Sequence, residues 1–350
     1  ERYRAIAAAG GWPMVPGTAK LSLGAVGPEV ALLRQRLAAS GDLPSTADAA
    51  APEVFDAALD AAVRAFQARH GLEVDGVVGP RTRAALNVSV QDRLATMAIN
   101  LERLRRLAPW LEPDYALVNI PAAEFRLVEA GRTVMQQRAI VGRPDRPTPE
   151  LDSAVTRIEL NPYWNVPPRI ARLDIVPKIR RDPGYLAREG IRVLGPDGEV
   201  DPAGIDWSGP AATRYRLRQD PGPRNALGVV KFRIPNSFDV YLHDTPSKAL
   251  FQRSERFFSS GCIRLERPLE LARHLLRSDP AWSGDALDRA SALGHVVIEL
   301  PKPMPIHLVY LTAWVDESGT VQFRRDVYGR DVPHALAART GRACGGAGVG

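Results

Sequence analysis

Apolar positions recur at helical spacing in the first part of the chain and alternate with polar positions in the second part. Between residues 16 and 89, three short helices are predicted. The first begins at Pro28 and ends at Gly41, and the third begins at Pro80, because proline favours the first helical turn and glycine the position after the last. Their inward positions are Val30, Leu33 and Leu37, then Leu59, Val63 and Phe66, then Thr82 and Leu86. The three helices should form a small domain around one apolar core.

Strands dominate the chain beyond Pro113, after a charged linker helix predicted over residues 90–112. The strands are predicted at 115–120, 124–129, 133–141, 155–160, 229–234, 238–243, 295–300, 306–315 and 321–325. Turn signals such as Glu317-Ser318-Gly319 separate several of them, which favours a β-sandwich or open barrel. One further helix is predicted to start at Arg267-Pro268.

The segment from about 165 to 227 interrupts the strands with many proline and glycine residues and short helical pieces. It is too long for an ordinary connection, so it is predicted to be an inserted capping subdomain that can close over a site. The strand-rich domain then spans 113–335, residues 1–15 are the remnant of an upstream region, and 336–350 form a glycine-rich disordered tail. The predicted fold class is α+β multidomain.

The composition is that of a soluble globular protein, since 45% of the 350 residues are hydrophobic and 25% are charged. The net charge of +6 would suit an anionic partner. However, the arginines are spread through every segment, which argues against nucleic acid and leaves a carboxylate-bearing polymer open. No stretch reaches the roughly 18 apolar residues of a membrane span. Residues 1–7 resemble the end of a helix, so an upstream signal or membrane anchor is expected.

Two residues carry the candidate chemistry. Cys262 lies in the run Ser259-Ser260-Gly261-Cys262-Ile263-Arg264, and His243 ends a predicted strand, with residues 244–258 between it and Ser259. A loop of that length can bring a thiol back to an imidazole. A thiol with a pKa of about 8.5 is mostly protonated at neutral pH, and a neighbouring histidine can accept its proton and later protonate a leaving amine. The pair predicts a cysteine acyl-transfer enzyme, with N–H groups around Gly261 and Cys262 stabilising an oxyanion.

Other interpretations of these residues stay open. Cys262 can be a small buried apolar residue, and His243 a strand-end histidine with Asp244 as a turn former. The Ser-Ser-Gly run and Arg264 on either side of the cysteine argue against simple packing. A Cys262–Cys344 disulfide is disfavoured because the tail offers no preset geometry. No two histidines show metal-ligand spacing with a carboxylate or cysteine, so no metal site is predicted.

The motifs resemble two known families. His243-Asp244-Thr245, the gap that follows and Ser259 to Arg264 are similar to the signature of the L,D-transpeptidase catalytic domain of the YkuD type. The helical segment, with its Val74-Asp75-Gly76 turn and Gly79-Pro80 helix start, resembles the small peptidoglycan-binding domain, although a spacer role for it is equally open. The large YcbB-type branch, which joins both domains and carries a capping insert, is indicated by the runs Asn100-Leu101-Glu102-Arg103, Val118-Asn119-Ile120-Pro121, Asn161-Pro162-Tyr163-Trp164 and Tyr310-Leu311-Thr312-Ala313-Trp314.

The resemblance implies a role for each site residue. Cys262 would be the nucleophile, His243 the base, and the main-chain carbonyl of Asp244 the group that orients the imidazole. Arg264 would support the loop or face the donor peptide. Tyr241 and Trp164 would line the cleft, or pack as core aromatics. Many relatives have His before the Gly-Cys pair and Asn two residues after the cysteine, where this chain has Ser260 and Arg264, as in the YcbB-type branch.

The resemblance also implies a reaction in the periplasm of a Gram-negative bacterium. The Cys262 thiolate would attack a peptidoglycan tetrapeptide stem, release its terminal D-alanine and form a thioester. An amine of a neighbouring stem would then take the acyl group, which forms a 3-3 cross-link without a cofactor. Carbapenem-type β-lactams would acylate the same thiol. The alternatives are an L,D-carboxypeptidase that uses water as acceptor, and a non-catalytic wall-binding scaffold. A papain-like protease is disfavoured, because its nucleophile precedes the histidine in sequence.

Overall fold

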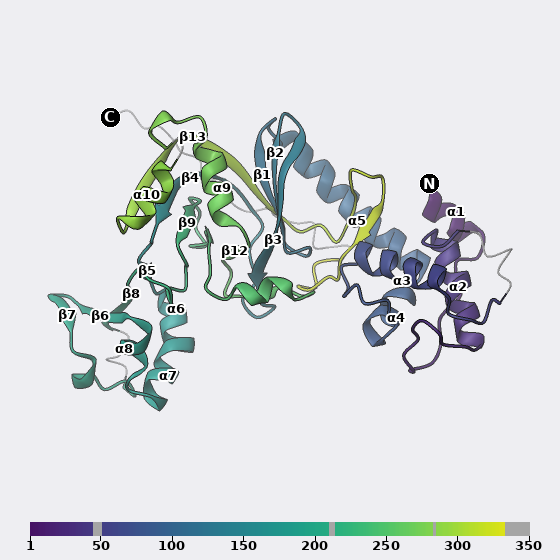
Figure 1. Ribbon diagram of the computed structural model, residues 1–350, viewed down its shortest axis with the longest axis horizontal. Coiled ribbons are helices and arrows are strands. Elements are labelled where there is room, and N and C mark those ends of the chain that lie inside the picture. The colour runs from purple at the N-terminus through teal and green to yellow at the C-terminus, as the bar shows by residue number, and fades with distance from the viewer. Residues whose placement is uncertain (45–50, 210–213, 283–284, 333–350) are drawn as a thin grey trace. The chain divides into compact units, whose positions relative to one another are not determined.

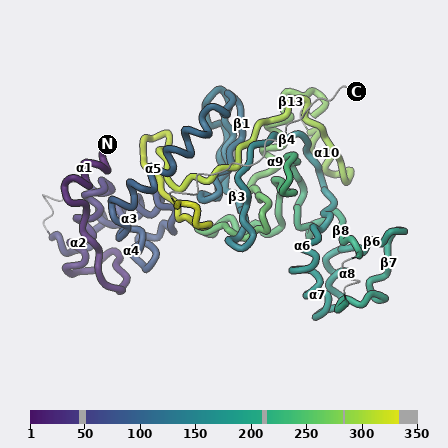
Figure 2. Tube along the Cα trace, turned by 180° about the vertical axis from the view of Figure 1, so that it is seen from behind, coloured from purple at the N-terminus to yellow at the C-terminus, as the bar shows by residue number. Residues whose placement is uncertain are grey.

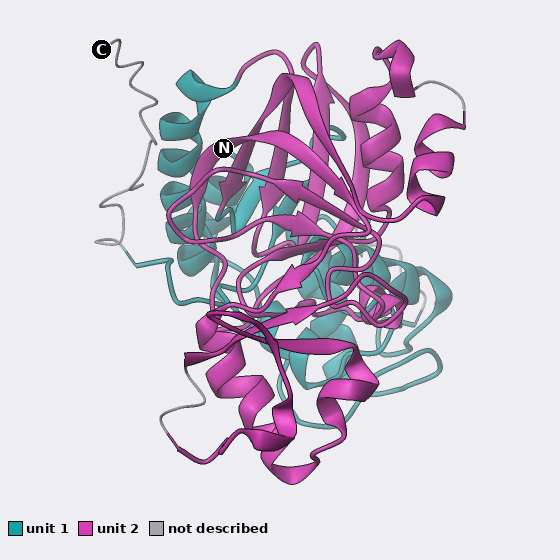
Figure 3. Cartoon of the chain, turned by 90° about the vertical axis from the view of Figure 1, so that its left-hand side faces the viewer, with its two compact units in different colours: residues 1–111, 310–338 teal, residues 112–309, 339–350 magenta. Residues whose placement is uncertain are grey.

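The computed structural model describes residues 1–44, 51–209, 214–282 and 285–332. The chain divides into two compact units, drawn in different colours in Figure 3. Of the described residues, unit 1 comprises Glu1–Leu111 and 310–332, and unit 2 comprises Glu112–Val309. The predicted tail at 336–350, with Cys344, lies outside the described residues.

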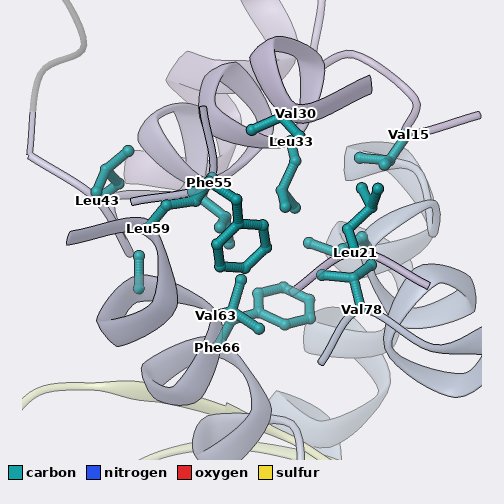
Figure 4. Close-up of a cluster of buried hydrophobic side chains, with 13 residues drawn as sticks. Val15, Leu21, Val30, Leu33, Leu43, Phe55, Leu59, Val63, Phe66 and Val78 are labelled. Atoms are coloured by element: carbon teal, nitrogen blue, oxygen red, sulfur yellow. The ribbon is translucent and has the colours of Figure 1, made fainter. Parts of the chain in front are cut away.

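The helices of unit 1 follow the apolar pattern of the sequence (Figure 1). They are α1 (Arg2–Ala8), α2 (Pro28–Ser40), α3 (Ala57–Arg69), α4 (Pro80–Leu86), α5 (Val90–Leu107) and the short η1 (Ala108–Trp110). Gly41 ends α2 in the left-handed conformation, and Asp56 caps α3 by accepting a 2.8 Å hydrogen bond from the Leu59 N–H. Side chains from α2, α3, α4 and their loops meet in one core, where Phe55, Phe66 and Leu33 are fully buried (Figure 4).

A C-terminal hairpin, β14 (Ala313–Val315) and β15 (Val321–Phe323), belongs to unit 1 rather than to the strand-rich domain predicted at 113–335. Hydrogen bonds and an ion pair with α5 explain why this hairpin belongs to unit 1. Thr312 exchanges two hydrogen bonds with the buried Asn100 of α5, at 2.7 and 2.9 Å, and Arg103 forms a 2.7 Å ion pair with Asp331. The spacing of apolar residues along the chain does not predict such contacts between residues far apart in the sequence.

Unit 2 is built on one sheet that closes on itself. Its strands are β1 (Tyr115–Asn119), β2 (Glu124–Glu129), β3 (Arg132–Gly142), β4 (Leu151–Leu160), β9 (Val230–Arg233), β10 (Leu242–His243), β11 (Phe257–Ser259), β12 (Ile263–Leu265) and β13 (Val296–Val309). The strand order is β11-β3-β12-β10-β9-β4-β13-β1-β2, and β2 also pairs with β3. Figure 2 labels β1, β3, β4 and β13 of this sheet along the trace of the chain. The predicted sandwich or open barrel is therefore a closed, barrel-like sheet.

Short helices occupy the connections between these strands. They are η5 (Lys248–Gln252), α9 (Pro268–Leu276), η6 (Pro280–Trp282) and α10 (Ala286–Ala292). Helix α9 begins at the predicted Pro268 and buries Leu271, Ala272 and Leu276. Because α9 follows β12 after only two residues, it anchors the strand that carries the cysteine motif.

The segment between β4 and β9 forms a small subdomain with its own core, which we call the cap (residues 164–219). Its strands β5 (Trp164–Asn165), β8 (Arg216–Gln219), β6 (Ile191–Gly195) and β7 (Gly198–Val200) pair in that order. Its helices are α6 (Pro168–Ile170), the π-helix η2 (Ala171–Ile175), α7 (Val176–Arg181), α8 (Tyr185–Glu189) and η3 (Pro202–Gly204). Ile179, Leu186 and Val193 are buried at its centre. The cap coincides with most of the insert predicted at 165–227.

Candidate active site

The register of two adjacent strands places the candidate residues on one face of the sheet. Strands β10 and β12 run parallel, with Leu242 opposite Ile263. Both of these side chains are fully buried. Because side chains alternate along a strand, the residues on either side of this pair project to the opposite face. Those residues are Tyr241, His243, Cys262 and Arg264, and all four line a cavity of about 770 Å³.

The cap supplies the other wall of this cavity, within unit 2. Trp164, Asp174 and Lys178 of the cap line it together with Ser260 of the barrel. The predicted residues Tyr241, Trp164, Ser260 and Arg264 therefore all border the same space as Cys262 and His243. Trp164 also packs against the apolar core of the cap, so it has both of the roles considered for it.

His243 is held as a neutral base. Its Nδ1 lies 2.5 Å from the main-chain oxygen of Asp244. A carbonyl oxygen only accepts, so Nδ1 carries the proton and Nε2 keeps a lone pair. Burial, with a smaller effect from the nearby Arg264 charge, lowers the pKa of His243 to about 3. At neutral pH the imidazole is thus unprotonated and able to accept a proton.

Asp244, which follows this histidine, contacts the segment that connects the cap to β9. Its buried carboxylate accepts a 3.0 Å hydrogen bond from the Val229 N–H and pairs with the Lys248 ammonium. Gly228 packs so closely against this carboxylate that a side chain there would overlap it, and its φ of 61° is in the left-handed region. The carbonyl that orients His243 is therefore fixed by the segment that returns from the cap.

Gly228→Ala is expected to lower the free energy of unfolding by about 2–4 kcal/mol, through left-handed backbone strain plus overlap with Asp244. Gly190→Ala is a matched control, because Gly190 has a φ of 63° but no neighbour within 4 Å of an added Cβ. That variant should lose only about 1 kcal/mol. Urea unfolding measures both values. Equal losses would show that Gly228 does not need to pack against the carboxylate.

Cys262 rests as a protonated thiol. Its Sγ lies 3.9 Å from the Asp239 main-chain oxygen, and burial raises the pKa of the thiol to about 11. Hydrogen bonding to Tyr241 and the charge of Arg264 act in the opposite direction, toward the thiolate, but are weaker than the burial effect. With the pKa of His243 at about 3, the resting pair is a neutral thiol and a neutral imidazole. A thiolate would form at neutral pH only with a group that removes the thiol proton.

We expect alkylation of Cys262 by iodoacetamide to accelerate about tenfold per pH unit between pH 7 and 10, because this reagent needs a thiolate and the raised pKa of about 11 lies above that range. The measurement uses a Cys344→Ser background, since the sequence holds two cysteines. A small cysteine peptide serves as the control and should level off above its own pKa of about 8.5. A plateau for Cys262 below pH 9 would mean that a preformed thiolate exists.

The nucleophile loop is ordered by hydrogen bonds around Gly261. Ser259 Oγ accepts from the Gly261 N–H at 3.1 Å and donates to the Cys262 carbonyl at 2.6 Å, while Thr148 Oγ1 donates to the Gly261 carbonyl at 2.7 Å. The φ of 120° at Gly261 is in the region that glycine favours. Because its N–H is already engaged by Ser259, Gly261 shapes the loop here.

Sequence reasoning missed the loop between β3 and β4. Arg146, which is buried, donates from Nη1 to Ser260 Oγ at 3.0 Å and from Nη2 to Asp174 Oδ1 of the cap at 2.9 Å. Its Nη1 also contacts the other Asp174 oxygen. The run from Arg143 to Pro149, with three prolines, was the available signal, because such a loop is stiff enough to hold side chains in place.

Arg264 and Tyr241 are the polar side chains next to the Cys262 thiol on the face shared by β10 and β12. Arg264 is largely buried, which lowers its pKa, and its Nε has no hydrogen-bond partner in the part of the chain that the structure describes. Burial raises the pKa of Tyr241 well above its ordinary value, so the phenol is neutral and can donate. Arg264 therefore places a positive charge near the sulfur, while its Nε is buried away from solvent.

Among the described residues, no cluster of three or more histidine, cysteine, aspartate or glutamate side chains could hold a metal ion. None of the described helices has the length and apolar character that crossing a membrane requires.

Comparisons with known proteins give two domain matches. Residues 113–283 match YkuD, the L,D-transpeptidase catalytic domain, and residues 26–86 match PG_binding_1, described as "Putative peptidoglycan binding domain". A Haemophilus influenzae protein described as "Putative L,D-transpeptidase" is 36% identical over 241 residues, which are 67% of this chain and 48% of that protein. The chain thus spans about half the length of this curated relative.

Solved structures that match part of this chain include L,D-transpeptidases. One, from Mycobacterium smegmatis, is 16% identical with a TM-score of 0.28, and the match covers 56% of this chain and 58% of that one. Another is L,D-transpeptidase 3 from Mycobacterium tuberculosis in complex with a faropenem-derived adduct, which is 15% identical with a TM-score of 0.26 over 56% of this chain and 60% of that one.

Proposed function

Because residues 113–283 belong to the YkuD family of L,D-transpeptidase catalytic domains and residues 26–86 to a peptidoglycan-binding family, we propose that this chain cross-links peptidoglycan through an acyl-enzyme on Cys262. The observation that carries the proposal is the common face of β10 and β12, from which Cys262 and His243 enter one cavity. The donor is a tetrapeptide stem, the acceptor is an amine of a neighbouring stem, and the product is a 3-3 cross-link.

The first half-reaction forms the thioester. Cys262 Sγ attacks the carbonyl carbon of the third residue of the donor stem while His243 Nε2 accepts the thiol proton. We assign the stabilisation of the negative charge on the carbonyl oxygen to the Cys262 N–H and Arg264. The tetrahedral intermediate then collapses, the carbon–nitrogen bond breaks, and His243 delivers the proton to the departing nitrogen of D-alanine. No redox step or cofactor is required.

The second half-reaction releases the product. The acceptor amine attacks the thioester carbonyl, His243 removes a proton from the nitrogen, and the carbon–sulfur bond breaks. The proton returns to Sγ, which restores the thiol. Water can attack the same thioester, so cross-linking requires that water be kept away from it. The cap forms one wall of the cavity, and we assign this exclusion to it.

The remaining parts of the proposal concern partners and place of action. Residues 26–86 would hold the enzyme on the glycan, and carbapenem-type β-lactams would acylate Cys262 because its thiol meets their strained amide in the same cavity. A cell-wall substrate requires action outside the cytoplasm, and we place the enzyme in the periplasm of a Gram-negative bacterium. The YcbB-type branch, which the capping insert and paired domains suggest, is part of the same proposal.

Intact-protein mass spectrometry after incubation with purified tetrapeptide stem tests the proposal. The native chain should lose D-alanine from the stem and show a transient adduct, and Cys262→Ala should do neither. Analysis of the products then separates the alternatives. Cross-linked dimers support transpeptidation, trimmed tripeptide alone supports the L,D-carboxypeptidase, and the absence of both, together with no carbapenem adduct, supports a non-catalytic wall-binding scaffold.

A further inference from the structure

The cavity around Cys262 is strongly basic. Among the described residues that line it, seven are arginine or lysine and three are acidic, namely Asp174, Glu189 and Asp239. Asp174 is already paired with Arg146. Such an imbalance in a partly enclosed space creates a positive potential that attracts anionic ligands.

Several of these cations have no carboxylate partner. The Lys178 ammonium of α7 lies 3.3 Å from the Tyr185 hydroxyl and over the ring of the same tyrosine, and it forms no ion pair with any described residue. Arg181, three residues later on α7, and Arg264 form no ion pair in the described part of the chain. Side chains three residues apart share one face of a helix. Lys178 and Arg181 therefore present two neighbouring unpaired charges to the cavity from the cap, on the side opposite the thiol strand.

We propose that Lys178 and Arg181 bind free carboxylates of the peptide substrate, so that the enzyme selects acidic stems over stems whose side carboxylates are amidated. This inference rests on the proposed function, because it concerns the occupant of the same cavity. A peptide whose carbonyl reaches Cys262 must extend along the space that the cap borders. Carboxylates on that peptide then meet α7, and an amide at the same position loses the ion pair.

The expected effect is moderate, because both side chains are exposed to solvent. Each exposed ion pair changes affinity by about two- to five-fold, so the two together give roughly a tenfold preference. The preference should decrease as salt is added, since screening weakens exposed charges. The terminal carboxylate of the leaving D-alanine is present in both kinds of stem and does not contribute to the difference.

The test compares two donor stems that differ only in amidation of the side carboxylate, and measures kcat/KM for formation of the adduct on Cys262. The native chain should prefer the free acid roughly tenfold at low salt. Lys178→Gln/Arg181→Gln should abolish most of that preference, because kcat/KM with the free-acid stem falls more than kcat/KM with the amidated stem. A matched control is Arg172→Gln/Arg216→Gln, which removes the same charge from exposed cap arginines that do not line this cavity.

Three results would overturn some part of this assignment. Equal acylation by both stems in the native chain removes the selectivity while leaving the proposed function intact. If the preference persists in Lys178→Gln/Arg181→Gln, the two residues do not bind the side carboxylate. The same conclusion follows if the control variant loses the preference equally. Failure of both stems to acylate Cys262 contradicts the proposed function itself.

Discussion

His243→Ala is expected to lower the rate of Cys262 acylation by roughly 10²- to 10⁴-fold, the usual contribution of a positioned general base. The reason is that the thiol is protonated at rest, with a pKa of about 11, so attack depends on a group that removes the proton during the reaction. His243, with its Nδ1 proton held by the Asp244 carbonyl, presents Nε2 for this purpose. Stopped-flow measurement of carbapenem acylation, followed by intact mass, gives the rate.

Asp244→Asn is the informative control for this variant. It keeps the main-chain carbonyl that orients His243, but loses the negative charge that pairs with Lys248. We expect a loss of about tenfold or less, because only the support of the carbonyl is weakened. If His243→Ala retained more than a tenth of the native rate, proton removal by His243 would not limit acylation, and a preformed thiolate would be the better explanation.

The elements of the fold were largely predictable, because each has a local signal. Proline and glycine mark both ends of α2, and the strands of unit 2 alternate apolar and polar residues as a half-buried sheet requires. The cap was visible as an interruption rich in proline and glycine. Closure of the sheet was not predictable, because it depends on the antiparallel pairing of β12 with β3 and on the parallel pairings of β10 with β12 and of β1 with β13, which apolar spacing does not encode.

The site shows the same division between local and long-range information. Cys262 and His243 stood out because they sit in short motifs, and the structure brings both to one cavity. Arg146 and Asp174 did not, because their pairing spans 28 residues and depends on how the cap folds against the barrel of unit 2. The motif drew attention to Ser259 and Gly261, but it did not show that the Gly261 N–H donates to Ser259 Oγ in the folded loop.

Arg146→Ala is expected to raise hydrolysis relative to cross-linking about tenfold, because Arg146 joins the cap to the nucleophile loop. Its guanidinium is 8% exposed and holds both oxygens of Asp174 as well as Ser260, which lies two residues before Cys262. Breaking a fully buried pair costs about 3–5 kcal/mol, and the partial exposure of Asp174 reduces this to about 1–2 kcal/mol. The cap then opens more often, and water reaches the thioester.

The ratio of cross-linked dimer to trimmed tripeptide measures this effect, and the rate of carbapenem acylation checks that the thiol remains competent. Asp174→Asn should shift the ratio in the same direction, since it removes the other half of the pair. Arg143→Ala is the matched control, because Arg143 lies in the same loop but pairs with the exposed Asp145, a contact worth little. A ratio that stays at the native value in Arg146→Ala, with acylation intact, would mean that this ion pair does not control access of water, and that exclusion must come from the substrate or from other cap contacts.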